Sequence, residues 1–306
     1  MVTQKMKQTS ILAALKRQSG SDRAFDIINH LILSLFTLSI LYPMYFIVIA
    51  SFSDPVAINN GQVFLFPVGF NTLGYQRIFE NSKIWISYGN TIFYTVVGTI
   101  VNISLTMLIA YPLSRKKFFA RKAILICVMF TMYFQGGLIP TFLWINKLHL
   151  YNTRLVMIVL PAINVFNLII AIGFIKNNIP EELYEAASID GYNHIAYFFK
   201  IVLPLSQTIL VVLVLYYGVS HWNEFMNGLI YLRDEHLYPL QLVLRAILLQ
   251  NQASGLGDID SIIEQQKAAE LIKYGVIIVS ILPVLTVYPF LQKHFTKFAM
   301  AGSIKG

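Results

Sequence analysis

The stretch EELYEAASIDGYNHIAYFFKIVLP, residues 181–204, lies between two long apolar runs, although its first half is polar. Pro180 precedes it and fits the first position of a helix, where a backbone N–H is not needed. Glutamates at the helix start are favoured by the helix dipole, and Asp190-Gly191 supplies a residue tolerant of positive φ at the end. A second helical piece over 193–199 leads into the next apolar run. The stretch therefore predicts a helix-turn-helix.

The composition of the chain indicates a membrane protein. Hydrophobic residues make up 56% of its 306 residues and charged residues only 12%, with a mean hydropathy of +0.63. Seven runs of at least 19 residues contain no charge. One of them, 55–76, is dense in Asn, Gly and Pro and is predicted to be a loop. The other six are each long enough to cover a hydrocarbon core of about 30 Å.

We therefore predict an all-α membrane protein with a six-helix transmembrane domain over residues 27–293. The predicted spans are 27–51, 86–112, 123–145, 155–175, 201–222 and 274–292, and the loop 177–200 holds the helix-turn-helix. We expect Pro204 in the first turn of the fifth span. We expect Pro161 to open the fourth span, and the Gly136-Gly137 pair to break the third.

The distribution of Lys and Arg predicts which ends face the cytoplasm. Residues 1–26 hold five, the loop 115–122 holds five, 176–200 holds two and the C-terminal end holds three, which is 15 of the 23 in the chain. Basic residues near span ends are retained on the cytoplasmic side. We therefore expect a basic N-terminal segment (1–26), the loop 177–200 and a C-terminal tail (294–306) on that side. Because the basic residues flank spans and form no continuous stripe, nucleic acid is not an expected partner.

The sequence shows no sign of a catalytic, metal or cofactor site. The single cysteine, Cys127, has no partner for a disulfide, and the six histidines have no paired spacing typical of metal ligands. Motifs for phosphate loops and nucleophile elbows are missing. The predicted span interiors contain no Asp, Glu, Lys or Arg, which disfavours a secondary transporter driven by ion coupling.

The opening stretch resembles the EAA loop of ABC importer permeases in seven residue types and their spacing over 20 residues. In that family the loop docks in a cleft on the ATP-hydrolysing subunit and carries its motion into the membrane. The resemblance implies the type I ABC importer permease fold. It also assigns ATPase coupling to Glu185, Ala186, Ala187, Asp190, Gly191, Ile201, Leu203 and Pro204.

Further stretches are similar to the carbohydrate-uptake branch, in particular to the smaller permease subunit of the maltose importer. They are Tyr42-Pro43 leading to Ser51-Phe52-Ser53, Trp222-Asn223-Glu224-Phe225, and the tail that ends in AGSIKG. In maltose-type relatives this tail reaches the interface between the two ATPase subunits. The resemblance extends this contact to Ala301, Gly302, Ser303, Lys305 and Gly306. The phrase QGGLIP, residues 135–140, resembles the subgroup for complex oligosaccharides.

The resemblance implies a multi-pass permease of a bacterial plasma membrane that imports sugars. It also implies the partners of the family: a second permease in a heterodimer, two copies of a cytoplasmic ATPase that binds ATP and Mg, and an extracellular sugar-binding protein. Membrane lipid surrounds such a subunit, and the substrate it implies is an oligosaccharide. No cofactor is expected in this chain, and no enzymatic activity. An ABC importer for amino acids or peptides shares the docking loop and is the alternative.

Polar and aromatic residues inside the spans are the candidates for the substrate pathway. Amide side chains offer donors and acceptors to hydroxyl groups, and aromatic rings stack on sugar faces. The candidates are Tyr133, Gln135, Asn164, Asn167, Trp222 and Asn223. Other roles compete with this one. Asn90 and Asn102 are expected to join helices, Asn164 and Asn167 are expected on one helix face, and Trp222 also suits an aromatic belt at the membrane surface.

Overall fold

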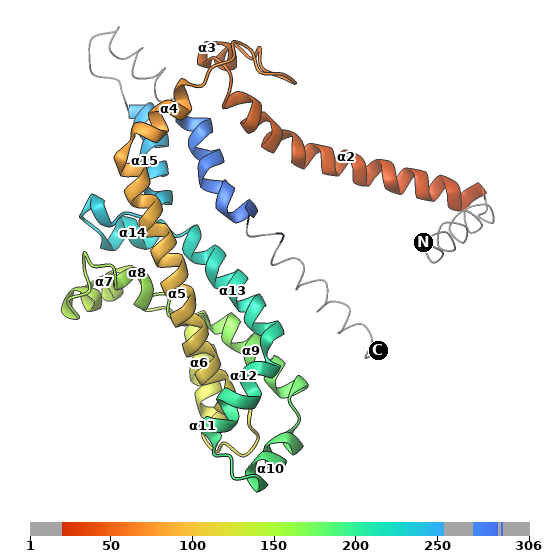
Figure 1. Ribbon diagram of the computed structural model, residues 1–306, viewed down its shortest axis with the longest axis vertical. Coiled ribbons are helices and arrows are strands. Elements are labelled where there is room, and N and C mark those ends of the chain that lie inside the picture. The colour runs from red at the N-terminus through yellow and green to blue at the C-terminus, as the bar shows by residue number, and fades with distance from the viewer. Residues whose placement is uncertain (1–19, 254–271, 287–288, 290–306) are drawn as a thin grey trace. The chain divides into compact units, whose positions relative to one another are not determined.

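The computed structural model describes residues 20–253, 272–286 and 289, and its regular elements in these ranges are all helices (Figure 1). The chain divides into two compact units, residues 1–72 and 73–306. The predicted ATPase contact in the C-terminal tail lies outside the described residues.

The first unit consists of one long helix and a folded loop. Helix α2 (Gly20–Ala50) contains most of the first predicted span, and α3 (Pro55–Asn59) is a single short turn within the predicted loop. The rest of the loop is held by backbone hydrogen bonds, from Asp54 N to Val68 O at 2.9 Å and from Asn71 N to Phe52 O at 2.9 Å. These bonds explain how a charge-free segment is ordered without forming a span.

The second unit is a set of helices packed around α5. Its described elements are α4 (Leu73–Glu80), α5 (Ser82–Ser114), α6 (Arg121–Tyr133), α7 (Leu138–Lys147), α8 (Val156–Val159), α9 (Val165–Asn178), α10 (Glu181–Ile189), α11 (His194–Tyr197), the π-helix η1 (Phe198–Val202), α12 (Leu203–Leu205), α13 (Gln207–Trp222), α14 (Met226–Tyr231), the 3-10 helix η2 (Glu235–Leu237), α15 (Leu240–Ala253) and the helix Ile272–Thr286.

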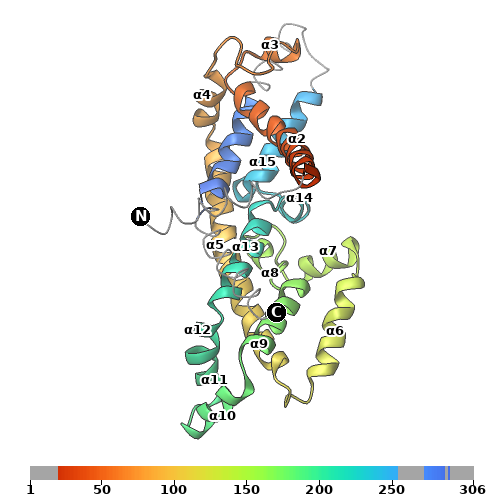
Figure 2. The ribbon, with the colours of Figure 1, turned by 90° about the vertical axis from the view of Figure 1, so that its right-hand side faces the viewer.

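Helix α5 forms the axis of this unit and packs against α9 and α13 (Figures 1 and 2). The Asn81 side chain caps its start by accepting a hydrogen bond from Lys83 N at 3.0 Å. Gly98 lets α13 approach closely, because a Cβ at this position would lie 2.4 Å from Nε2 of His221. Residues such as Leu113, Leu168 and Leu213, almost fully buried, fill the space between the three helices.

Fewer continuous apolar helices are described than the six spans predicted. Helices α2 and α5 are long and apolar enough to cross a membrane alone. Two bent pairs meet the same test if each counts as one span: α6 with α7, bent by 115°, and His194–Leu205 with α13, bent by 79°. Helix α9 and the helix Ile272–Thr286 are apolar but shorter. The described part of the chain thus supports two to four spans, and six remains a prediction.

Two of the interruptions confirm predictions made from local sequence. The third span ends at Tyr133 and resumes as α7 after Gly137, whose φ is +85°, as expected for a break at the glycine pair. The fourth is interrupted around Pro161, because α8 ends at Val159 and α9 starts at Val165. Proline removes a backbone donor and clashes with the preceding turn, which ends the helix.

The prediction that Pro204 lies in the first turn of the fifth span was wrong. Pro204 does not lie in its first turn but in α12, while the long helix α13 begins at Gln207. The chain bends at Ser206, where ψ is 10°. The π-helix η1 precedes the proline, and its wider turn accommodates a residue that cannot continue the α-helical hydrogen bonds.

Candidate functional site

The first of the EAA-like residues, Glu185 to Ala187, lie in a short helix with a defined end, as predicted. Helix α10 starts after Pro180 and has Glu181 and Glu182 in its first turn. At its other end Gly191 has a φ of +83° and donates from N to Ser188 O at 3.1 Å. Tyr192 N donates to Ala187 O at 2.9 Å, so the two bonds make a Schellman motif. The motif fixes the direction in which the chain leaves α10.

The paired alanines of α10 have different surroundings. Ala187 is 5% exposed and belongs to the core of the second unit, whereas Glu185 and Ala186 are exposed. Only one of the two methyl groups is therefore free to meet another protein. Among the other EAA-like residues, Asp190, Gly191 and Pro204 are exposed, and Ile201 and Leu203 pack partly against the same core.

Arg115 joins α10 to the end of α5. It is the C-cap residue of α5, and its Nη2 lies 3.6 Å from Oε1 of Glu181. The guanidinium carbon is 4.4 Å from the ring centre of Tyr184 and 5.8 Å from that of Tyr197. The Arg115 side chain is only 13% exposed, so water screens these contacts less than it screens an ordinary surface ion pair.

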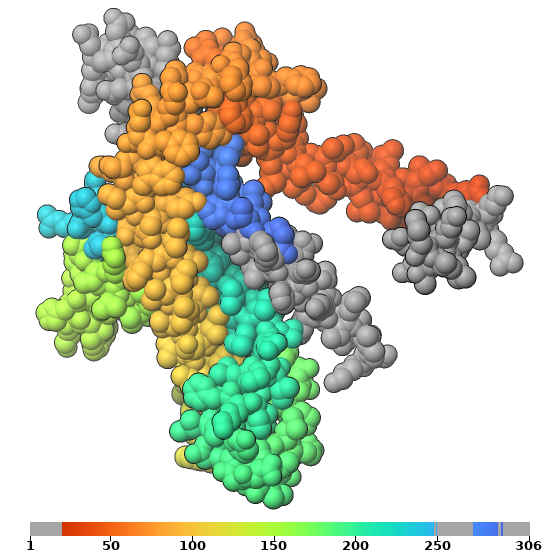
Figure 3. Space-filling model, in the orientation of Figure 1, coloured from red at the N-terminus to blue at the C-terminus, as the bar shows by residue number. Residues whose placement is uncertain are grey.

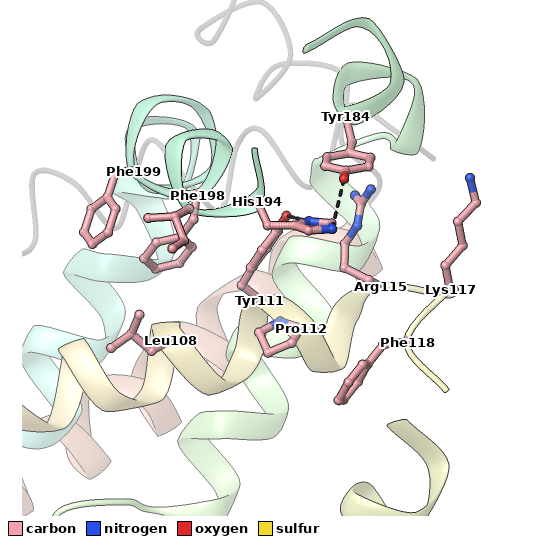
Figure 4. A pocket seen from close by; sticks show the side chains of 11 residues that line it. Leu108, Tyr111, Pro112, Arg115, Lys117, Phe118, Tyr184, His194, Phe198 and Phe199 are labelled. Atoms are coloured by element: carbon pink, nitrogen blue, oxygen red, sulfur yellow. Dashed lines mark hydrogen bonds between the residues drawn. The ribbon is translucent and has the colours of Figure 1, made fainter. Parts of the chain in front are cut away.

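His194 adds a second connection between the same elements (Figure 4). Its Nε2 lies 3.0 Å from the Tyr184 hydroxyl and its Nδ1 lies 3.2 Å from the Tyr111 hydroxyl. The imidazole is stacked on the Tyr184 ring at 4.8 Å with 7° between the planes. We call Tyr111, Arg115, Tyr184 and His194 the Arg115 cluster. It joins α5, α10 and α11 through charge, stacking and hydrogen bonds.

Sequence reasoning missed the Arg115 cluster. One local signal was present, because Tyr111 and Arg115 are four residues apart and so share a face of α5. Nothing local connects them to Tyr184 and His194, which are about 70 to 80 positions further along the chain.

A polar network satisfies the backbone where the fourth span is interrupted. The Asn102 amide donates to Pro161 O, and its oxygen is 2.8 Å from Nε2 of His221. Tyr217 OH accepts from the backbone N of Asn164 at 3.2 Å and lies 2.7 Å from Oγ1 of Thr106. Non-helical backbone at membrane depth persists only where such partners exist or where it lines a cavity.

The expectation that Asn90 and Asn102 join helices is confirmed for both residues. Asn102 bridges α5 to the α8–α9 interruption, as described above. Asn90 Nδ2 donates to His236 O at 2.7 Å and to Tyr238 O at 3.2 Å, and its oxygen accepts from Arg154 at 3.3 Å. Both side chains therefore connect α5 with segments distant in sequence.

The predicted substrate residues fall into exposed and buried groups. The side chains of Tyr133, Gln135, Asn164 and Asn223 are exposed. Asn167 and Trp222 are buried, and the indole N–H of Trp222 donates to Ser280 O at 3.1 Å, so this residue packs against the helix Ile272–Thr286.

The expectation that Asn164 and Asn167 share one face of a helix was wrong. Asn164 is the N-cap of α9 and accepts from Asn167 N at 3.1 Å. It lies outside the helix because the interruption at Pro161 extends as far as its own position.

Helices α6 and α7 lie to one side of α5 in Figure 2, and α7 protrudes beside α5 in Figure 3. Residues 131–140 are all exposed, including Tyr133 at 76% and Ile139 at 71%. Trp144 is 59% exposed. Such a continuous apolar surface is typical of contact with lipid or with another subunit.

Known proteins with similar sequences include permeases of sugar transport systems. No model of a known protein family matches the sequence. The polygalacturonan/rhamnogalacturonan transport system permease protein YtcP of Bacillus subtilis (strain 168) is 40% identical over 287 residues, which are 93% of this chain and 99% of that protein. The arabinooligosaccharides transport system permease protein AraQ of Halalkalibacterium halodurans is 26% identical over 273 residues, 87% of this chain and 91% of that protein.

A solved structure is similar over nearly the whole chain. It is a chain of a bacterial ABC transporter involved in the import of the acidic polysaccharide alginate, with a TM-score of 0.82 and 33% sequence identity. The match covers 91% of this chain and 99% of that one.

Proposed function

The chain belongs to the permease subunits of sugar ABC importers, which are membrane proteins and not enzymes, and on that premise we propose that α10 receives the motion of an ATPase subunit. One observation carries the proposal. Helix α10 leaves Glu185 and Ala186 exposed while its far side is fixed to α5 through Arg115. A surface helix with one side exposed to a partner and the other side attached to a long helix transmits force from that partner to the long helix. The EAA-like residues given above are the proposed coupling residues.

The proposed mechanism is alternating access driven from outside this chain. Two ATPase subunits bind ATP and Mg, close on each other, and draw α10 and its counterpart in a second permease together. Movement of α10 reaches α5 through the Arg115 cluster, and α5 carries it to α9 and α13, which pack against it. Hydrolysis of ATP in the partner subunits resets the pore. This chain supplies the lever and needs no catalytic group.

The same proposal places the subunit in a larger assembly in a bacterial plasma membrane. We propose a heterodimer with a second permease, and the exposed apolar surface of α6 and α7 supports such a contact. An extracellular sugar-binding protein delivers the substrate. The tail residues 301–306, outside the described part, are proposed to reach the ATPase interface.

We further propose six spans, with both termini on the cytoplasmic side. In this arrangement α6 with α7 forms one span despite its bend. Helices α8 and α9 form another around Pro161. The interruption at Pro161 is compatible with this count because backbone groups there have side-chain partners in Asn102 and Tyr217.

For the substrate, we propose an oligosaccharide that carries carboxylates. Residues 81–180 contain no Asp or Glu, and their basic residues include Lys147 at the end of α7 and Arg154 in the loop before α8. A similar solved structure comes from an importer of the acidic polysaccharide alginate. Of the pathway candidates, the exposed Tyr133, Gln135, Asn164 and Asn223 are available for contact. Asn167 and Trp222 are buried, so they require a rearrangement before they can contact substrate.

The charge of the substrate can be tested through ATP hydrolysis. Purified transporter should show a higher ATPase rate with binding protein and oligogalacturonate than with binding protein and neutral maltooligosaccharides.

Gly191 offers the sharpest test of coupling through α10. Replacing it with valine forces a β-branched residue into a φ of +83°, which breaks the turn after α10, although no other atom lies within 4 Å of the added Cβ. We expect Gly191→Val to insert into the membrane and assemble, but to lose sugar uptake relative to ATP hydrolysis. Gly191→Asn is the matched control, because asparagine tolerates this conformation, and it should keep most coupling. Normal uptake by Gly191→Val in proteoliposomes would refute the proposal.

A further inference from the structure

A pocket of about 510 Å³ is lined in part by all four residues of the Arg115 cluster, and coupling as proposed above does not require a ligand in it (Figure 4). Its volume is within the range of about 300–1,000 Å³ that is usual for small-molecule sites. The end of α5, the loop after it, α10, α11 and η1 form its walls. A cavity of this size next to a moving helix raises the question of what fills it in a membrane.

The lining changes from apolar to cationic along α5. Leu108 and Phe199, which are 50% and 57% exposed, line one end together with Phe198. Arg115 and Lys117 line the other end. At a rise of about 1.5 Å per residue, Leu108 and Arg115 are separated by roughly 10 Å along the helix axis.

The direction of this gradient matches that of a membrane surface. Helix α5 is long and apolar enough to span, and it ends at Ser114. With the span 86–112 proposed above, Leu108 lies near the edge of the hydrocarbon core, and Lys117 lies beyond it, where phosphate groups lie.

At the cationic end, Lys117 is only weakly neutralised. The loop 115–122 has five basic residues and no acidic one. In the described part of the chain, salt bridges join only Arg115 and Lys117 of these five to carboxylates. The Lys117–Glu185 pair, at 3.6 Å, has side chains that are 76% and 60% exposed. An exposed pair of this kind is weak, so Lys117 is available to an anion.

We propose that the pocket binds one anionic phospholipid, with an acyl chain along Leu108, Phe198 and Phe199 and the phosphate at Lys117. The ligand class follows from the apolar floor and cationic rim, which match the two ends of such a lipid. The bound lipid packs between α5 and α11 and stabilises the part of the unit to which α10 is attached. A free phosphate, or a segment of the partner permease, would satisfy only one end of this gradient.

The test uses the complete transporter in nanodiscs that contain phosphatidylcholine with or without phosphatidylglycerol, with lipid retention measured by native mass spectrometry. We expect selective retention of phosphatidylglycerol. Lys117→Gln should lower it roughly fivefold, the usual contribution of one basic residue near an anionic surface. Lys116→Gln is the matched control, since it removes the same charge from an exposed neighbour that does not line the pocket. Glu185→Gln breaks the same ion pair but keeps the Lys117 cation, and should retain the lipid.

A second variant tests the apolar end of the pocket. The three contrary results that follow its expected result would overturn the proposal. Leu108→Trp fills the pocket and should displace the lipid while Lys117 stays in place. Equal losses in Lys116→Gln and Lys117→Gln would reduce the effect to general surface charge. Displacement of the lipid by inorganic phosphate would identify a free-anion site, and full retention in Leu108→Trp would exclude the pocket. Sugar-stimulated ATPase activity in the same nanodiscs reports separately on the coupling function.

Discussion

At the scale of single residues, Arg115 holds α10 by its charge and by its shape. Its guanidinium pairs with Glu181, and the guanidinium carbon lies 4.4 Å from the centre of the Tyr184 ring. A lysine keeps the charge but lacks the guanidinium group over the ring, a contact that contributes about 0.5–2 kcal/mol depending on burial.

We therefore expect Arg115→Lys to assemble normally but to couple poorly, with several-fold less sugar transported for each ATP hydrolysed. Proteoliposomes that report uptake and phosphate release together provide the measurement. Lys116→Arg, a conservative change at the exposed neighbour, should leave the ratio unchanged. Wild-type coupling in Arg115→Lys would show that the ion pair alone is enough or that α5 is not driven through this contact.

Two glycines on α5 make a second matched pair. A Cβ at Gly98 would lie 2.4 Å from Nε2 and 2.5 Å from Cε1 of the buried His221, whereas a Cβ at Gly89 meets nothing within 4 Å. We expect Gly98→Ala to destabilise the subunit by about 1–3 kcal/mol through overpacking. Gly89→Ala should be neutral or stabilising by up to about 1 kcal/mol, because alanine favours the helix. Thermal unfolding of the purified complex in detergent compares them, and equal midpoints would mean that α5 and α13 are not packed this closely.

At the scale of elements, the sequence predicted those interruptions that have a local cause. Pro161 and the pair Gly136-Gly137 act on their own backbone, so their effects could be predicted without knowing the fold. The bend at Ser206 depends on the π-helix before Pro204, and a π-helix has no comparable sequence signal. The same limit explains why the two alanines of α10 could not be told apart, since the burial of Ala187 depends on tertiary packing.

The interruption between α6 and α7 can be tested through its glycines. Gly137 has a φ of +85°, while Gly136 has no positive φ and an added Cβ there meets nothing within 4 Å. We expect Gly137→Ala to cost about 1–2 kcal/mol, since an L-residue is strained in this conformation, and to reduce sugar uptake severalfold. Gly136→Ala should have little effect on either. Melting temperature and uptake are measured on the same preparations, and equal behaviour of the two variants would argue against a fixed break at Gly137.

At the scale of the whole molecule, composition was sufficient to predict a helical membrane protein and the EAA-like motif was sufficient to predict the family, whereas contacts between distant residues were not predictable. The Arg115 cluster joins Tyr111 to His194, and the polar network joins Asn102 to His221 across more than a hundred positions. A single sequence contains apolar periodicity and turn signals, but it does not state which polar groups meet. Both missed sites are of this kind, and both lie where α5 meets other helices.

The proposed topology leads to a direct test with cysteine reagents. Cys127 is the single native cysteine, so a Cys127→Ala background accepts one introduced thiol at a time. Lys116 and Asp190 are exposed on segments predicted to face the cytoplasm, whereas Gln62 and Arg233 are exposed on segments predicted to face outward. In intact cells we expect a membrane-impermeant maleimide to label Gln62→Cys and Arg233→Cys at once. Lys116→Cys and Asp190→Cys should react only after permeabilisation. Labelling of Asp190→Cys in intact cells would place α10 on the side without ATP, and an ATPase could then not reach it.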